Sequence, residues 1–221
     1  MNYAQYFCAG LLIASLHSTA AAQTPAPSPS PTPAITITPA AGAEIDRNYV
    51  VAAAQGDMFE IAAAQVALVR AQSASVKRYA RMLLQDHTTS LADLTPLASS
   101  LGITLPADVT AEQKVSLGGL DSLSGRIFDR EYVHEEINDH EVDIDLAKTE
   151  ARHGTDPAVR ANAAKELRVL RKHLATGERV ENILQASARR AAAQRRRSRS
   201  VSTAPRPANT RSGSAASSGS K

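Results

Sequence analysis

Residues 44–186 are predicted to form an all-α domain: a bundle of four long helices, with a long connection that carries a short extra helix between the second and third. Proline and glycine are scarce in this region, and Ala, Leu, Glu, Lys and Arg, which favour helix, are abundant. Apolar residues recur at intervals of three and four through four segments of roughly 25 to 30 residues, and no segment shows the alternation typical of a strand. Rods about 40 Å long with one apolar face bury that face by packing together.

Residues 1–22 are predicted to be a signal peptide. An apolar run over residues 7–16 is followed by three alanines ending at Ala22, the small-residue pattern that precedes cleavage. The run is too short to span a bilayer. Cys8, the single cysteine, precedes most of the run and is badly placed for a lipid anchor. The chain is therefore expected to be exported, periplasmic or envelope-associated, and to hold no disulfide or thiolate metal site after cleavage at Ala22.

Two segments of biased composition flank the predicted bundle. Residues 23–43 are rich in proline and carry no charge before Glu44, which is typical of an extended spacer. Residues 187–221 carry nine Lys or Arg and no acidic residue. Removing these nine from the 25 basic residues leaves 16 against 22 acidic ones, so the rest of the chain has a net charge of about −6. The last 35 residues, 187–221, are predicted to be a disordered basic tail.

The basic tail suggests a partner of opposite charge. Its arginines are expected to contact an anionic envelope surface of lipid or polymer. Specific recognition of nucleic acid is not expected, because neither aromatic residues nor a folded nucleic-acid-binding motif accompanies the arginines. The sequence leaves open whether the protein forms a homo-oligomer. The arginines concerned are Arg189, Arg190, Arg195, Arg196, Arg197 and Arg199.

The first two long helices are delimited by polar caps. Asp46 is expected to cap the first helix, which runs to about Ala71. Ser73 or Ser75 begins the second helix, which is expected to end at Leu101.

The second helix contains a proline and leads into a long connection. Pro96 is expected to kink this helix or to shorten it by a turn. Within the connection over residues 102–125, Thr110 and Gln113 form a capping-box pattern before spaced leucines. The pattern predicts a short helix at that point.

The third and fourth long helices are joined by a tight turn. The third is predicted over Arg126 to His153, and the fourth opens at Asp156 and Pro157, an N-cap followed by a proline at the first helical position. It is expected to end near Ala186. Two tight turns and one long connection suit a ferritin-like four-helix bundle, in which the long connection crosses the length of the bundle.

Each predicted apolar stripe contains one polar residue near the middle of its helix. His87 stands where a leucine would be expected, His140 and His173 repeat this on the third and fourth helices, and Glu60 is the polar residue on the first. Midpoints of equal antiparallel rods share one layer. The four side chains are therefore predicted to converge at the centre of the bundle.

A carboxylate and three imidazoles in a bundle centre suggest a metal site. Burying them unpaired would be costly, and one divalent ion would satisfy them together. Three nitrogens and one oxygen suit Zn, Mn, Fe or Cu better than Ca or Mg. Glu136 lies one turn before His140 and Asp143 three residues after it. Each is a candidate for a further metal ligand, or for a hydrogen-bond acceptor that orients an imidazole from outside the ligand set.

Another interpretation makes the same histidines ordinary hydrogen-bonded core residues, with Tyr49, Tyr79 and Tyr132 as partners. Asp86 and Asp139 immediately precede His87 and His140 in the sequence. Their side chains therefore point about 100° away from those of the histidines around the helix axis, and they are expected to be peripheral. The exposed positions expected for His134 and His153 exclude them from the cluster.

Five sequence blocks carry a resemblance to a known family. In order they are GDMFEI, MLLQDH, FDREY, NDHE and RKHL, within a match over roughly Asp46 to Ile183. With them the chain resembles the bacterial exported proteins grouped as domain of unknown function 4142, often described as predicted outer membrane proteins and ferritin-like. The resemblance implies the bundle and export, and it supplies no established activity.

The chain departs from di-iron carboxylate bundles, which use Glu-x-x-His pairs. The residues three before the histidines are Leu84, Ile137 and Leu170. The hypothesis is therefore an exported bundle that binds one transition metal, in metal handling or envelope stress. The alternative is a structural or interaction module with an anion-binding tail. An enzyme is the third choice, because the sequence offers no nucleophile arrangement or cofactor motif.

Overall fold

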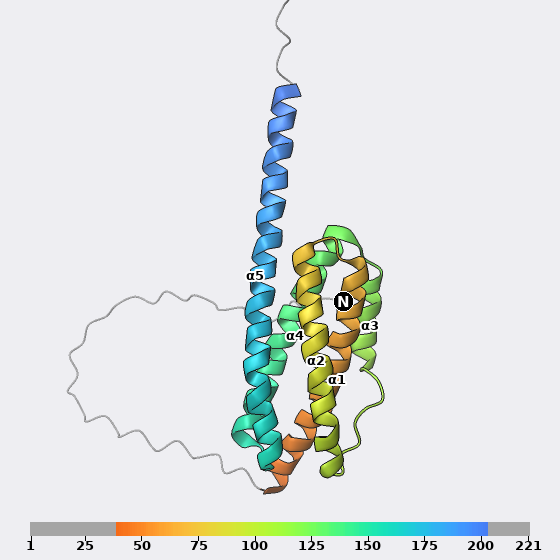
Figure 1. Cartoon of the computed structure of the whole chain (residues 1–221), viewed down its shortest axis with the longest axis vertical. Coiled ribbons are helices and arrows are strands. Elements are labelled where there is room, and N and C mark those ends of the chain that lie inside the picture. Colours follow the sequence, from red (N-terminus) through yellow and green to blue (C-terminus); the bar gives the residue numbers. More distant parts are fainter. Residues whose placement is uncertain (1–38, 203–221) are drawn as a thin grey trace, which may run out of the picture. The chain divides into compact units, whose positions relative to one another are not determined.

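The computed structural model describes residues 39–202, which form five helices packed as a bundle (Figure 1). The predicted all-α fold is confirmed, and within residues 39–202 the β structure consists of an isolated bridge between Ala71 and Gly125. The helices are α1 (Pro39–Arg70), α2 (Ala74–Ser100), α3 (Ala111–Asp121), α4 (Gly125–His153) and α5 (Pro157–Ser202). The described helices include none long and apolar enough to cross a membrane.

The four long helices form two hairpins, α1 with α2 and α4 with α5, that pack against each other. The connection between the hairpins places α3 alongside α1 (Figure 1). It returns the chain to the end of the bundle where α2 begins, as the bridge between Ala71 and Gly125 shows. This is the predicted long crossing, and it makes α2 and α4 run in the same direction.

A polar layer divides the core of the bundle into two apolar clusters. On α2, for example, the buried His87 lies between Leu83 of one cluster and Leu94 of the other. The first cluster includes Ala67, Tyr79, Leu83, Phe128, Tyr132 and Val180, and the second includes Tyr49, Val50, Leu94, Ile144, Val159 and Leu170. Each long helix contributes to both clusters, so apolar packing on both sides holds the middle layer in place.

The caps predicted for two helices are confirmed. The Ser73 side chain caps α2 and accepts a hydrogen bond from the backbone N–H of Ser75 at 3.3 Å. Thr110 and Gln113 form the full capping box of α3, with reciprocal bonds of 3.1 and 2.9 Å. Pro96 does not shorten α2, which continues to Ser100.

Asp46 does not cap the first helix, contrary to the prediction. Helix α1 begins at Pro39, a residue tolerated in a first helical turn, so Asp46 lies inside it. Its carboxylate accepts hydrogen bonds from the backbone and hydroxyl of Thr155 at 2.8 and 2.6 Å and from the Asp156 backbone at 3.0 Å. At the other end of the bundle, Asp129 accepts bonds from two backbone N–H groups of the α1–α2 turn. Each hairpin turn is thus fixed by a carboxylate from the other hairpin.

The predicted end of the last helix near Ala186 is wrong. Helix α5 continues to Ser202, because the added residues are mainly Ala, Arg, Gln and Ser, and the next proline is Pro205. The added turns run past the ends of the other helices (Figure 1). The arginines named above as a candidate anion-binding set are exposed on this part of α5.

Some predicted segments lie outside the described residues. These are the signal peptide at 1–22, residues 23–38 of the predicted spacer, and residues 203–221 of the tail. The remaining spacer residues, from Pro39, belong to α1.

Glu150 is expected to make stability fall as the pH rises. This side chain is fully buried at the end of α4, and burial, together with nearby Asp46, raises its pKa from an ordinary 4.5 to about 8. Between these values the folded protein keeps a proton that the unfolded chain releases, so the free energy of unfolding declines with rising pH. Urea unfolding at pH 5 and pH 9 measures the decline, which we expect to be smaller in Glu150→Gln. The exposed Glu141→Gln is the control, and equal declines in all three proteins would contradict the assignment.

Candidate metal centre

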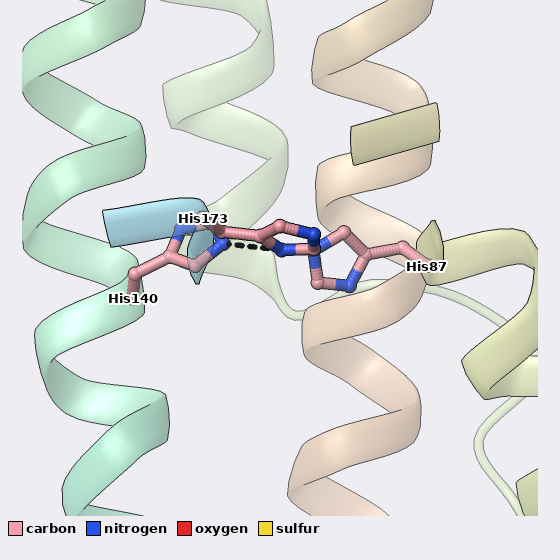
Figure 2. Close-up of side chains that lie close together, drawn as sticks. All are labelled: His87, His140 and His173. Atoms are coloured by element: carbon pink, nitrogen blue, oxygen red, sulfur yellow. Dashed lines mark hydrogen bonds between the residues drawn. The ribbon is translucent and has the colours of Figure 1, made fainter. Parts of the chain in front are cut away.

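The polar layer brings together side chains from all four long helices. The predicted histidines, His87, His140 and His173, come from α2, α4 and α5 and are at most 3% exposed. Figure 2 shows their rings meeting between the helices. Each supplies one ring nitrogen to a group whose atoms lie within 4.8 Å of one another. The three imidazoles predicted to converge therefore do so.

His87 is held by two carboxylates from α1. Its Nδ1 lies 2.8 Å from Asp57 Oδ1 and 2.8 Å from Glu60 Oε2. Nδ1 carries a single hydrogen and can donate it to only one of the two carboxylates, and the geometry directs this hydrogen to Asp57. Its other nitrogen, Nε2, is buried without a hydrogen-bond partner among the described residues. Burial opposes the charged ring, but Glu60 and Asp57 outweigh it, and the pKa of His87 is raised well above 6.5.

His140 is held by the backbone of its own helix. Its Nδ1 donates to the carbonyl oxygen of Glu136 at 2.7 Å, and since a carbonyl only accepts, Nδ1 carries the proton. Burial lowers the pKa of His140, so the ring is neutral near pH 7 and Nε2 presents a lone pair.

His173 is held by a carboxylate on the neighbouring helix α2. Its Nε2 donates to Asp86 Oδ2 at 2.9 Å. Burial lowers the pKa of His173 to about 4, so the ring is neutral and its Nδ1 presents a lone pair. This nitrogen lies 3.1 Å from Nε2 of His140, along the dashed line in Figure 2.

The three rings therefore share one arrangement. In each, one nitrogen is fixed by an oxygen acceptor, and the other is left for the centre. Two of the remaining nitrogens, on His140 and His173, face each other with lone pairs 3.1 Å apart, which is unfavourable unless a cation or a proton lies between them. Proteins orient metal-bound imidazoles in the same way, by a hydrogen bond from the second ring nitrogen to a carboxylate or carbonyl.

Glu60 lies against two of the histidines. Its Oε2 and Oε1 are 2.8 and 3.3 Å from the Nδ1 atoms of His87 and His140. Burial raises its pKa, but its interactions with His87 and, less strongly, with His140 outweigh burial, and the net shift is downward. Within residues 39–202, Glu60 belongs to three further groups that can hold a metal ion, of which one contains Glu136 and His140 and another Asp57 and His87.

The third of these groups combines Glu60 with Asp139 and Asp143. Burial raises the pKa of Asp139 to about 7, with a further contribution from Glu60, and burial also raises that of Asp143 well above 3.8. Asp143 and Glu136, predicted as further ligands or second acceptors, both lie beside Glu60. It is the backbone carbonyl of Glu136, rather than its carboxylate, that orients His140.

Three acidic residues of this layer were not anticipated. The prediction that Asp86 and Asp139 are peripheral is wrong, because Asp86 binds His173 and Asp139 lies beside Glu60. A side chain turned about 100° around its helix from the bundle centre faces a neighbouring helix. Asp57 was not proposed as a site residue, although it shares a helical face with Glu60, three residues later. That spacing was the available signal.

The predicted tyrosine partners do not bind the histidines. Tyr49 donates to Asn162 at 2.8 Å. Within the described part of the chain, the hydroxyls of Tyr79 and Tyr132 make no hydrogen bond to His87, His140 or His173. As predicted, His134 and His153 are exposed.

Comparisons with known proteins agree with this architecture. The crystal structure of a DUF305 fragment from Deinococcus radiodurans is similar, with a TM-score of 0.57 and 16% identity, over 62% of this chain and 95% of that one. At this identity the likeness shows the helical fold alone. The search of curated proteins gives no match. The pattern of the domain of unknown function DUF4142 matches residues 31–180, and the chain therefore belongs to the DUF4142 family.

Proposed function

We propose that this protein binds one transition-metal ion through His87, His140 and His173, with Glu60 beside the ion as a further ligand or balancing charge. The observation that carries the proposal is the shared arrangement of the rings. Each has one nitrogen fixed by Asp57, the Glu136 carbonyl or Asp86. The other nitrogens of His140 and His173 face each other, and that of His87 is buried without a hydrogen-bond partner among the described residues. A bundle that needed only packing would place leucines there.

The donor set favours a particular class of ion. Imidazole nitrogen suits Zn, Cu, Fe and, with carboxylate present, Mn, whereas Ca and Mg prefer oxygen. His140 and His173 are neutral near pH 7 because burial lowers their pKa values, so their lone pairs are available. His87 keeps a proton because Glu60 and Asp57 raise its pKa. Metal binding would displace that proton and would therefore tighten as the pH rises.

The proposed setting is the cell envelope, with metal binding rather than turnover as the activity. The signal-peptide pattern at residues 1–22 supports export. The exposed arginines of the added α5 turns support contact with an anionic envelope surface, although specific nucleic-acid binding is not part of the proposal.

Metal content tests the proposal. The full chain, purified without a histidine tag, would be equilibrated separately with Zn²⁺, Cu²⁺, Mn²⁺ and, without air, Fe²⁺, then desalted and analysed for bound metal. We expect about one equivalent of the preferred ion, because one set of three imidazoles is present. His140→Ala and His173→Ala should lose it.

The matched control is His134→Ala, an exposed histidine on the same helix as His140. It should retain the metal, and circular dichroism would establish that all variants remain helical. Failure of the wild-type protein to retain any of the four ions, or equal loss from His134→Ala, would overturn the proposal.

A further inference from the structure

The polar layer contains an oxygen-only group beside the histidines. Glu60 reaches it from α1, and Asp139 and Asp143, one turn apart, reach it from α4. One carboxylate oxygen of each lies within 4.8 Å of the others. The proposed histidine site uses neither Asp139 nor Asp143.

Buried carboxylate oxygens without a hydrogen-bond donor point to a missing ligand at this place. Glu60 is fully buried, and within residues 39–202 neither of its oxygens has a hydrogen-bond donor, because the hydrogen on His87 Nδ1 is directed to Asp57. Oδ2 of Asp139 is likewise buried without a donor in the described region. Carboxylate oxygens left in this way are unfavourable unless a cation or proton reaches them.

Lysine and arginine side chains do not supply the missing charge. Among the described residues, the ion pairs of Glu60 are with His87 and His140, and no Lys or Arg pairs with Asp139 or Asp143. The basic residues of the bundle pair elsewhere, as Lys165 does with Asp93 at 2.6 Å on the surface.

Asp143 is directed across the bundle towards α1. Its two carboxylate oxygens lie 3.5 and 3.7 Å from the position that a Cβ at Gly56 would take, one helical turn before Glu60. A cavity of about 30 Å³ borders Asp143, Asp57 and His87, and it has room for a water molecule. A cation held by three carboxylates commonly completes its ligand set with water.

We infer that Glu60, Asp139 and Asp143 form a second cation site that takes a hard divalent ion such as Mn²⁺ through oxygen ligands alone. The inference rests on the proposed function in one respect: Glu60 contacts His87 and His140, so the two sites share this carboxylate. The nitrogen site selects a softer ion and the oxygen site a harder one. The centre would hold two unlike ions side by side.

Manganese titration of the zinc-treated full chain tests the inference. Zinc occupies the histidine site first, and binding is then followed by the loss of the free Mn²⁺ signal in electron paramagnetic resonance. We expect one Mn²⁺ per chain, bound about tenfold or more weakly by Asp139→Asn/Asp143→Asn. That variant should still retain zinc, because it keeps all three histidines.

The control is Glu141→Gln/Asp145→Asn, an exposed pair with the same spacing on α4. It should bind Mn²⁺ as the wild type does. Zinc retention without Mn²⁺ binding would overturn this inference and leave the proposed function standing. Mn²⁺ binding that depends on Asp139 and Asp143, in a protein that retains no Zn²⁺, Cu²⁺ or Fe²⁺, would support the oxygen site and contradict the histidine site. Equal Mn²⁺ affinities of the two double variants would overturn the inference.

Discussion

Replacing His87 with alanine is expected to lower the free energy of unfolding of the metal-free protein by about 3–5 kcal/mol. His87 lies 2.8 Å from both Asp57 and Glu60, and all three side chains are at most 6% exposed. Removing the imidazole leaves two buried carboxylates without their partner, and it also leaves a cavity. Urea unfolding at pH 7 with a chelator present measures the loss.

A double-mutant cycle with Asp57→Asn tests the cause of this loss. Once Asp57 has no charge, removing His87 should cost less, and the coupling should fall within about 0.5–3 kcal/mol. The exposed His153→Ala should change stability by no more than about 0.5 kcal/mol. Strict additivity of His87→Ala and Asp57→Asn would show that the ion pair does not contribute.

Zinc at a hundredfold excess over its dissociation constant is expected to raise the free energy of unfolding by about 2.7 kcal/mol. The ion binds the folded chain, where the three rings already converge, and the unfolded chain lacks this arrangement. Thermal unfolding at increasing zinc concentrations measures the effect as a rising midpoint.

The same titration separates ligands from the residues that orient them. His173→Ala should show no rise, because a proposed ligand is gone. Asp86→Ala should show a rise at about 10–100-fold higher zinc concentration, since it removes only the acceptor of the His173 ring. An equal rise in the wild type and His173→Ala would place zinc elsewhere on the protein.

Most of the fold could be predicted from the sequence because its helices are long and strongly periodic. The two ends that were misplaced are explained by local chemistry. Asp46 is a good N-cap residue, and only the neighbouring hairpin shows that its carboxylate serves the turn at Thr155 instead. Ala186 stands at a change in composition, but the arginine-rich residues beyond it favour helix as strongly as those before it.

The centre of the site could be predicted because the position of a residue between the two ends of its helix can be counted from the sequence. His87, His140 and His173 interrupt apolar stripes near the middle of the segments predicted from the sequence. They converge because the added turns of α5 run past the other helices, which leaves packed segments of similar length. Asp86 and Asp139 could not be recognised in this way. Each helix in a bundle touches two neighbours, and which flank faces which neighbour depends on the packing of the whole, as the bond from His173 on α5 to Asp86 on α2 shows.

X-ray absorption at the zinc edge of the zinc-loaded full chain tests the central claim most directly, because it reports the atoms around the ion. The account predicts scattering from three imidazole rings, with zinc–nitrogen distances of about 2.0–2.1 Å. The signal of one ring should disappear in His140→Ala. A spectrum of oxygen ligands with no more than one imidazole, unchanged in that variant, would contradict the histidine centre.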